Sequence, residues 1–103
     1  MQINSSIPLL FYRQNGRLAT MRSYRGYTVG SRRRLSSNGE YIGMANIIES
    51  SDLSALMLKE RKTRTQILER YLPDSGFSSV RQWEAEAFRL HGEKPPFIVV
   101  IKR

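Results

Sequence analysis

The Asn38-Gly39 pair is the feature that most constrains how this chain can fold. It lies between two runs of residues typical of β-strands, residues 31–35 and residues 41–48. Both residues tolerate positive φ, which the two-residue turn of a β-hairpin requires. Because such a turn joins neighbouring strands in opposite directions, the sequence predicts an antiparallel sheet built around this hairpin.

Further strands and helices are predicted on either side of the hairpin. Residues 18–24 alternate as a strand, residues 97–101 form a buried apolar strand, and residues 7–12 are either a short buried strand or a single helical turn. Three helices are predicted: residues 53–59 after a cap at Ser51 or Asp52, residues 67–72, and a helix after Ser78-Ser79 that buries Val80, Trp83, Ala87 and Leu90. A chain of 103 residues has room for one core. We therefore expect one mixed α and β domain over residues 1–103, with a small, mainly antiparallel sheet or barrel and a candidate flexible segment at residues 1–6.

Positive charge is concentrated in the first 39 residues. This part holds seven arginines and no lysine, aspartate or glutamate, whereas the remaining ten basic residues nearly balance the nine acidic ones. A solvated basic face, as on a thermophilic protein, is one interpretation, but such a face normally mixes both signs. Arginine offers a planar fork to phosphate and stacks on bases, so the pattern favours RNA or single-stranded nucleic acid as a partner.

The composition excludes several classes of site. The chain has no cysteine and a single histidine, His91, which excludes disulfides, thiolate nucleophiles and zinc sites with several cysteine or histidine ligands. No apolar run approaches the ~20 residues of a membrane span, and the first ten residues lack the pattern of a secretory signal. We expect a cytoplasmic monomer without metal or cofactor, in which His91 has a surface or helix-capping role.

The alternation of side chains along the strand at residues 18–24 places several polar residues on one face. Thr20, Arg22 and Tyr24 share one face, and Arg17 at the start of the strand can reach it. A hydroxyl between two guanidinium groups suits a phosphate or a base carbonyl, and Tyr24 offers a ring for a base. Tyr27 and Tyr41 also offer rings on which a base can stack. The alternatives are ordinary amphipathic packing for the tyrosines and an internal ion pair for Arg22.

Three phrases, together with the order of the elements, resemble the ASCH domain, which has a PUA-like fold. They are GRLATMR at residues 16–22, YTVG at residues 27–30, and SGFSSVRQW at residues 75–83 before the closing apolar strand. The signature Gly-x-Lys-x-x-Thr-x-Arg falls on residues 15–22. Thr20 and Arg22 match it, while Asn15 and Arg17 stand at the places of the glycine and the lysine. The resemblance covers roughly residues 7–103.

The resemblance implies a pseudo-barrel of five or six mainly antiparallel strands with two or three packed helices, and a cleft lined by the signature residues. ASCH proteins are widely proposed to bind RNA, and some members hydrolyse acetylated cytidine or act as ribonucleases. In the amidohydrolase members the signature lysine and threonine work with a glutamate, whose place falls near Asp74-Ser75 in this chain. Arg17 departs from this pattern because arginine does not readily lose a proton, and Asp74 departs from it because its side chain is shorter.

Two functions are consistent with these residues. The preferred one is a nucleic-acid binding module, for RNA, with contacts from Arg17, Thr20, Arg22, Tyr24, Arg25, Arg32, Arg33 and Arg34. The alternative is a small hydrolase of the ASCH type that acts on an acetylated cytidine nucleoside or on RNA, with Thr20 and a carboxylate, Asp74 or Glu60, in the chemistry. The absence of a lysine at position 17 and of a clear glutamate near position 75 favours binding.

Overall fold

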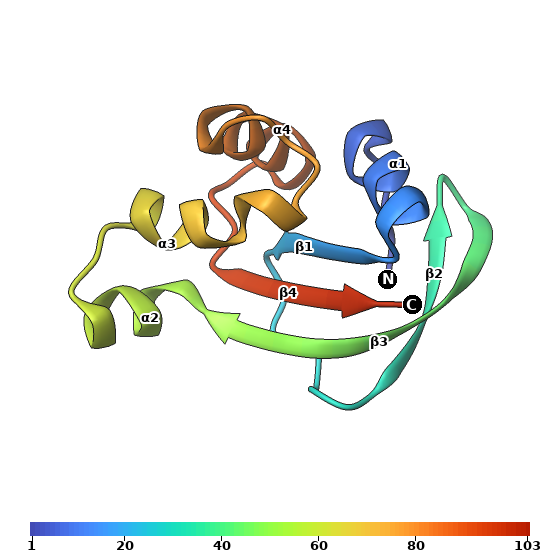
Figure 1. The fold of residues 1–103 in the computed structure, drawn as a ribbon, viewed down its shortest axis with the longest axis horizontal. Helices are drawn as coiled ribbons and strands as arrows, with labels where there is room; N and C mark the ends of the chain where they lie inside the picture. The colour runs from blue at the N-terminus through green and yellow to red at the C-terminus, as the bar shows by residue number, and fades with distance from the viewer.

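The computed structural model describes all 103 residues, and one antiparallel sheet organises them (Figure 1). The strands are β1 (Arg17–Arg22), β2 (Arg32–Ser37), β3 (Glu40–Asp52) and β4 (Phe97–Lys102), and they lie in the order β1-β4-β3-β2. The helices are α1 (Ser6–Asn15), α2 (Leu53–Glu60), α3 (Arg64–Tyr71) and α4 (Val80–His91), with a 3₁₀ turn, η1 (Leu72–Asp74), after α3. No helix is both long enough and apolar enough to cross a membrane.

The mixed α and β architecture is confirmed, but the sheet is open and has four strands instead of the expected five or six. Residues 7–12, for which a strand was one alternative, belong to α1. Two features favour this helix: Pro8 lies in its first turn, where proline is tolerated, and Gly16 ends it with a φ of 68° and an N–H donated to the Tyr12 carbonyl at 2.7 Å. Because α1 is a full helix, the structure has four α-helices and not the expected two or three.

The central hairpin is confirmed. Asn38 and Gly39 have φ values of 51° and 84°, as the tight turn between β2 and β3 requires. A bulge at Leu35/Ser36 bends the hairpin, and β3 continues over 13 residues, further than the predicted residues 41–48. It ends at Asp52, whose carboxylate caps α2 by accepting hydrogen bonds from the backbone of Ser54 and Ala55.

The N-terminal segment, residues 1–5, runs beside β2. The Ile3 N–H donates to the Ser36 carbonyl at 2.8 Å, and the Ser36 N–H donates to the Met1 carbonyl at 3.0 Å. The Ile3 side chain is buried. This segment, which the sequence marks as a candidate for flexibility, is thus packed against the sheet.

Two apolar clusters lie on opposite faces of the sheet, because the strands alternate. Ala19, Met21, Ile98 and Val100 face α2, α3 and α4. Leu18, Leu35, Ile47, Val99 and Ile101 face the other way, where Tyr12 of α1 and Ile3 complete the second cluster. Figure 1 shows the resulting arrangement, with α3 and α4 above β1 and β4, and α1 near the steeply crossing β2.

Candidate functional site

A small cavity lies at the free edge of β1. β1 is an edge strand, and the N-terminal segment and α4 close the space beside it. The cavity has a volume of about 50 Å³, enough for a few water molecules or one small polar group. Its ionisable and hydroxyl-bearing lining groups come from three parts of the chain: Ser5, Thr20, Arg22, Glu86 and His91.

One wall of the cavity is apolar. It contains Trp83 and Ala87 of α4, together with Phe77 from the segment before this helix. The rings of Phe77 and Trp83 are stacked, with centroids 6.5 Å apart and planes 16° apart. Since both rings also belong to the buried cluster beneath the helices, this wall is held rigidly by the core.

Arg22 is a cation without an anionic partner. It takes part in none of the ion pairs of the structure, and its buried Nε atom has no hydrogen-bond partner. Burial lowers the pKa of Arg22 from its usual value, and Tyr27 partly opposes this effect. The expected alternative of an internal ion pair at Arg22 is therefore wrong. The Glu86 carboxylate in the same cavity accepts a hydrogen bond from Ser5 Oγ at 3.0 Å and another from Arg89, which lowers the pKa of Glu86.

His91 is the last residue of α4, and it lines the cavity. The expected surface or capping role therefore describes only part of its position. Burial lowers the pKa of His91, and the positive charge of Arg22 lowers it further. Glu93 and a hydrogen bond with the Met21 backbone act in the opposite direction. At neutral pH the cavity therefore combines a charged guanidinium with a neutral imidazole.

We expect the depressed pKa of His91 to make the protein less stable in mild acid. The unfolded chain binds a proton at His91 near its ordinary pKa of about 6.5, whereas the folded chain resists it until a lower pH. The stability that the neutral imidazole contributes is thus present above about pH 6.5 and is lost as the pH falls through the folded-state value. The measurement is the melting temperature of the wild-type protein and of His91→Gln between pH 7.5 and pH 5.5.

The wild-type protein should lose more stability over this range than His91→Gln. Carboxylates with lowered pKa values, such as Glu60 and Glu86, titrate below this range and do not interfere. The amino terminus also has a lowered pKa, but it contributes equally to both proteins. Equal losses in the two proteins would show that His91 is not held neutral by the cavity.

Arg17 does not join Thr20 and Arg22, which corrects the expected three-residue cleft. Arg17 and Thr20 are three residues apart on β1, so they project from opposite faces of the sheet. The Arg17 Nε atom instead lies 3.1 Å from Asp74 Oδ2 at the end of η1. Thr20 and Arg22 do share the cavity, as the alternation predicts.

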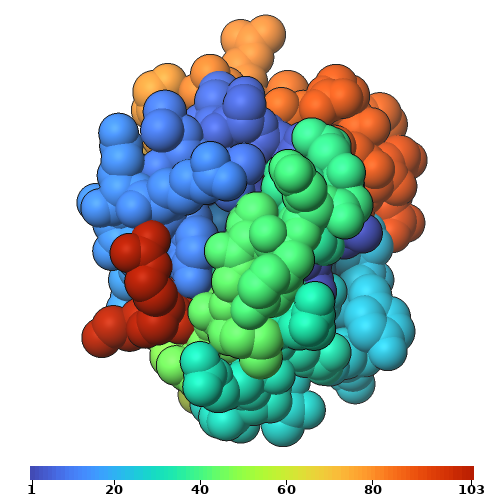
Figure 2. All heavy atoms as spheres, turned by 90° about the vertical axis from the view of Figure 1, so that its right-hand side faces the viewer, coloured from blue at the N-terminus to red at the C-terminus, as the bar shows by residue number.

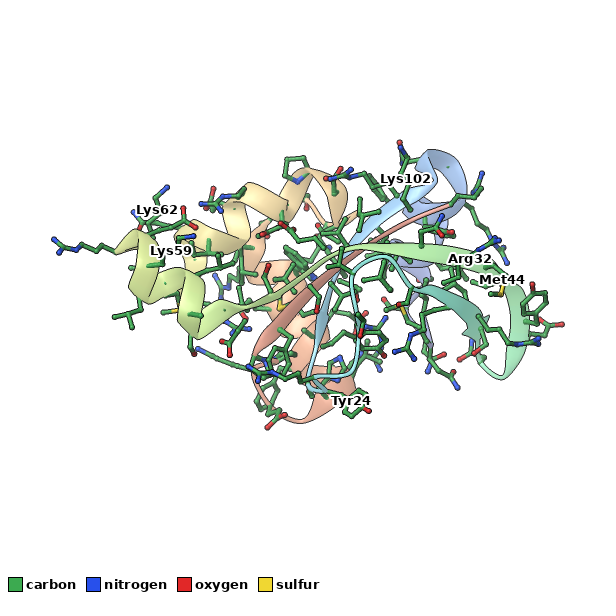
Figure 3. All side chains as sticks on the ribbon, turned by 90° about the horizontal axis from the view of Figure 1, so that it is seen from below. Tyr24, Arg32, Met44, Lys59, Lys62 and Lys102 are labelled. Atoms are coloured by element: carbon green, nitrogen blue, oxygen red, sulfur yellow. The ribbon has the colours of Figure 1, made fainter.

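The loop between β1 and β2, residues 23–31, contains Tyr24, Arg25 and Tyr27, which the sequence marks as candidate ligand contacts. They differ in whether other parts of the protein already contact them. Arg25 pairs with Asp52 at 3.2 Å and lies over the ring of Phe97. Arg33 of β2 donates to the Gly26 carbonyl and lies over Tyr27. Tyr24 is 68% exposed and meets Tyr27 edge to face at 6.1 Å, and Figure 3 shows it at the surface of the loop. Tyr24 is thus the aromatic residue of this loop that is free to stack on a ligand.

Arg32 and Arg34 are exposed on β2, and neither forms an ion pair. The Arg34 guanidinium lies 4.4 Å from the centre of the Tyr41 ring, which is itself exposed. Arg33, between them in sequence, points to the other side of the strand, where Ala45 is its cross-strand partner. The Arg32-Arg33-Arg34 run is therefore split between two faces of the sheet.

The carboxylates of the hydrolase hypothesis are held away from Thr20. Asp74 pairs with Arg17, and Glu60 pairs with Arg70 between α2 and α3. Neither carboxylate lines the cavity that contains Thr20. No three histidine, aspartate or glutamate side chains form a group that could hold a metal ion.

Sequence reasoning missed His91, Glu86 and Ser5 as members of the site. A signal for His91 existed, because it follows Trp83 and Ala87 at intervals of four residues and so continues the buried stripe of α4. No local pattern pointed to Ser5, which reaches the cavity only because the N-terminal segment packs beside β2. Leu90, predicted as buried, is instead 43% exposed.

Comparison with known proteins adds no relative. No protein-family model, no curated protein and no solved structure matches this chain. A function must therefore be inferred from the geometry of the site and the distribution of charge.

Proposed function

We propose that the protein binds RNA and that the cavity at Arg22 receives a phosphate or base oxygen of the bound strand. The observation that carries this proposal is Arg22, a half-buried side chain whose Nε atom is buried and unpaired. Desolvating a cation costs free energy when no anion contacts it, and the Glu86 carboxylate of the same cavity forms no ion pair with Arg22. An anionic ligand would supply the missing hydrogen-bond acceptor.

The size and lining of the cavity favour a small oxygen-bearing group. A volume of about 50 Å³ is small for a whole nucleoside but sufficient for phosphate oxygens or the edge of a base. Arg22 supplies a planar fork, and the Thr20 hydroxyl can donate to the same group. The exposed ring of Tyr24 offers a surface on which a base can stack. This ring meets Tyr27 of the same loop, and Tyr27 raises the pKa of Arg22.

We also propose that the chain is an ASCH domain with a PUA-like pseudo-barrel. In support, Arg17 stands at the place of the signature lysine, and it contacts Asp74, which lies near the place that the resemblance gives to a glutamate, at 3.1 Å. The N-terminal segment beside β2 further extends the curved sheet toward closure. A monomeric state and a cytoplasmic location remain predictions.

Binding is favoured over hydrolysis by the same contact. The Arg17 guanidinium is engaged with Asp74 and neither residue lines the cavity, so neither is available as a base for a substrate there. We expect no turnover of acetylated cytidine by the wild-type protein. Release of acetate that is lost in Thr20→Ala would contradict this expectation and establish the hydrolase.

The proposed function predicts binding to single-stranded RNA that weakens steeply with salt. If four to six phosphates are contacted, the slope of log affinity against log salt concentration should be about −3 to −4, because each neutralised phosphate of a single strand releases condensed counterions. The measurement is fluorescence anisotropy of an end-labelled RNA 12-mer at several salt concentrations between about 50 and 300 mM.

Competition supplies the control for this measurement. Unlabelled RNA should displace the probe, whereas an uncharged polymer of similar length should not. A slope near zero, or the absence of binding at about 50 mM salt, would remove RNA binding as the function.

A further inference from the structure

Part of the sheet surface carries cations that are far from the Arg22 cavity. On the face that bears α2, α3 and α4, the helices cover Ala19 and Val100 but not the strand ends beyond them. Lys102 of β4, Asn46 of β3 and Arg32 of β2 are direct cross-strand partners there. Since directly paired residues point to the same side of a sheet, these three side chains form one row.

Arg34 widens this row. It is two residues from Arg32 on β2, so it shares the same face, and its cross-strand partner is Met44. Figure 3 shows Lys102, Arg32 and Met44 together at the β2 end of the sheet, and in Figure 2 the C-terminal end of the chain lies on the same side of the molecule as the β2–β3 hairpin. We call Lys102, Asn46, Arg32 and Arg34 the sheet strip.

The three cations of the sheet strip are exposed, and none forms an ion pair. Two strand spacings separate Lys102 from Arg32, about 10 Å, and two residues separate Arg32 from Arg34, about 7 Å. Like charges at these distances repel one another, and no carboxylate stands between them to relieve the repulsion. The strip is thus prepared for a ligand with several negative charges.

We propose that the sheet strip binds the phosphate backbone of a single RNA strand laid across β4, β3 and β2. This inference rests on the proposed RNA binding and adds a second contact that shares no residue with the Arg22 cavity. Arginine forks suit phosphate oxygens, and the contact of Arg34 with Tyr41 limits its freedom before binding. A membrane surface fits less well, because the strip contains no apolar side chain, and Met44, the cross-strand partner of Arg34, is half-buried and offers little to insert between lipids.

A pair of double variants tests the strip. Arg32→Gln with Lys102→Gln removes two charges from it, and Lys59→Gln with Lys62→Gln removes two exposed charges at the opposite end of the molecule, as Figure 3 shows. In the anisotropy assay with the RNA 12-mer, the strip variant should bind about tenfold more weakly at low salt. Its salt slope should be smaller by about 1.4, because two phosphate contacts of a single strand are lost. The control variant should keep the slope of the wild-type protein.

A third variant separates charge from shape. Arg32→Lys with Lys102→Arg keeps both charges, so it should keep the slope. Equal slope changes in the strip and control variants would overturn the strip, since the effect would then reflect total charge alone. If the strip variant keeps the slope of the wild-type protein while replacement of Arg22 still weakens RNA binding, the proposal for the strip is overturned and the proposed function is retained.

Two other outcomes also decide the question. If the wild-type protein binds no RNA at about 50 mM salt, the proposed function and the strip fail together. If Arg32 and Lys102 are instead required for binding to phosphatidylserine vesicles, with no effect on RNA, the strip is a membrane contact and the inference is overturned.

Discussion

Replacing Arg22 by methionine should make the protein more stable and, at the same time, weaken its binding to RNA. The Arg22 side chain is half-buried without an ion-pair partner, and its buried Nε atom has no hydrogen bond, so the folded state bears a desolvation cost that the unfolded state does not. Methionine has a similar length, no charge and a flexible apolar chain that can fill the same space. The two effects have opposite signs because one residue determines both.

The expected sizes can be set from similar substitutions. Apolar replacement of buried ion pairs is neutral or stabilises proteins by up to about 4 kcal/mol, so for the half-buried Arg22 we expect a rise of a few degrees in the melting temperature. Loss of a charge-assisted contact to phosphate costs about 1.5–3 kcal/mol of binding, or roughly 10- to 150-fold in affinity. Thermal unfolding followed by circular dichroism and the RNA anisotropy assay measure the two changes.

Arg17→Met is the matched control, because Arg17 lies on the same strand but is exposed and paired with Asp74. It should lower the melting temperature by no more than a few degrees, since exposed ion pairs contribute about 0–1 kcal/mol. It should weaken RNA binding less than Arg22→Met. A lower melting temperature in Arg22→Met would mean that the guanidinium has a stabilising partner in solution. The inference that the cavity binds an anionic ligand would then fail.

Trp83→Ala should produce the largest loss of stability among the substitutions considered. Trp83 is 3% exposed, stacks on Phe77 and supports both the core beneath the helices and the apolar wall of the cavity. Truncation of a buried tryptophan costs about 3–5 kcal/mol, a large part of the 5–15 kcal/mol that stabilises a typical domain. The melting temperature should fall by about 12 °C or more.

Phe88→Ala provides the comparison on the same helix. Phe88 is 56% exposed, so its removal should change the free energy of unfolding by about 0.5 kcal/mol or less. Both variants should be followed by circular dichroism, because Trp83 is the only tryptophan and its removal abolishes the usual fluorescence signal. Similar losses in the two variants would show that the α4 stripe is not packed as described.

The strands and most helix ends could be predicted because their signals are local. Asn38-Gly39 specifies its turn by its own backbone preferences, and the caps at Asp52 and Ser79 form hydrogen bonds within three residues. Residues 7–12 remained ambiguous because a short apolar run suits both a strand and a helix. Only packing against Leu18 and the rest of its cluster decides between them.

The site was predictable only where it follows a single strand. Alternation along β1 correctly placed Thr20 and Arg22 together, but it also separates Arg17 from them, which the expectation of a shared cleft overlooked. The other members come from the two ends of the chain: Ser5, Glu86 and His91. Their meeting depends on how α4 and the N-terminal segment pack against β1, and no local rule of sequence contains that information.

The position of β4 has a consequence for how the chain folds. This strand comes last in the sequence, yet it lies between β1 and β3, so Arg17 meets Lys102 and Asp52 meets Phe97 across its two edges. A ribosome releases β4 only after β1, β2, β3 and the helices, and until then β1 has no partner strand and the sheet lacks its centre. Pairings between such distant segments slow folding relative to helical proteins of equal length. The hairpin and helices can form earlier during synthesis, whereas the cavity at Arg22 can be completed only after β4 has left the ribosome.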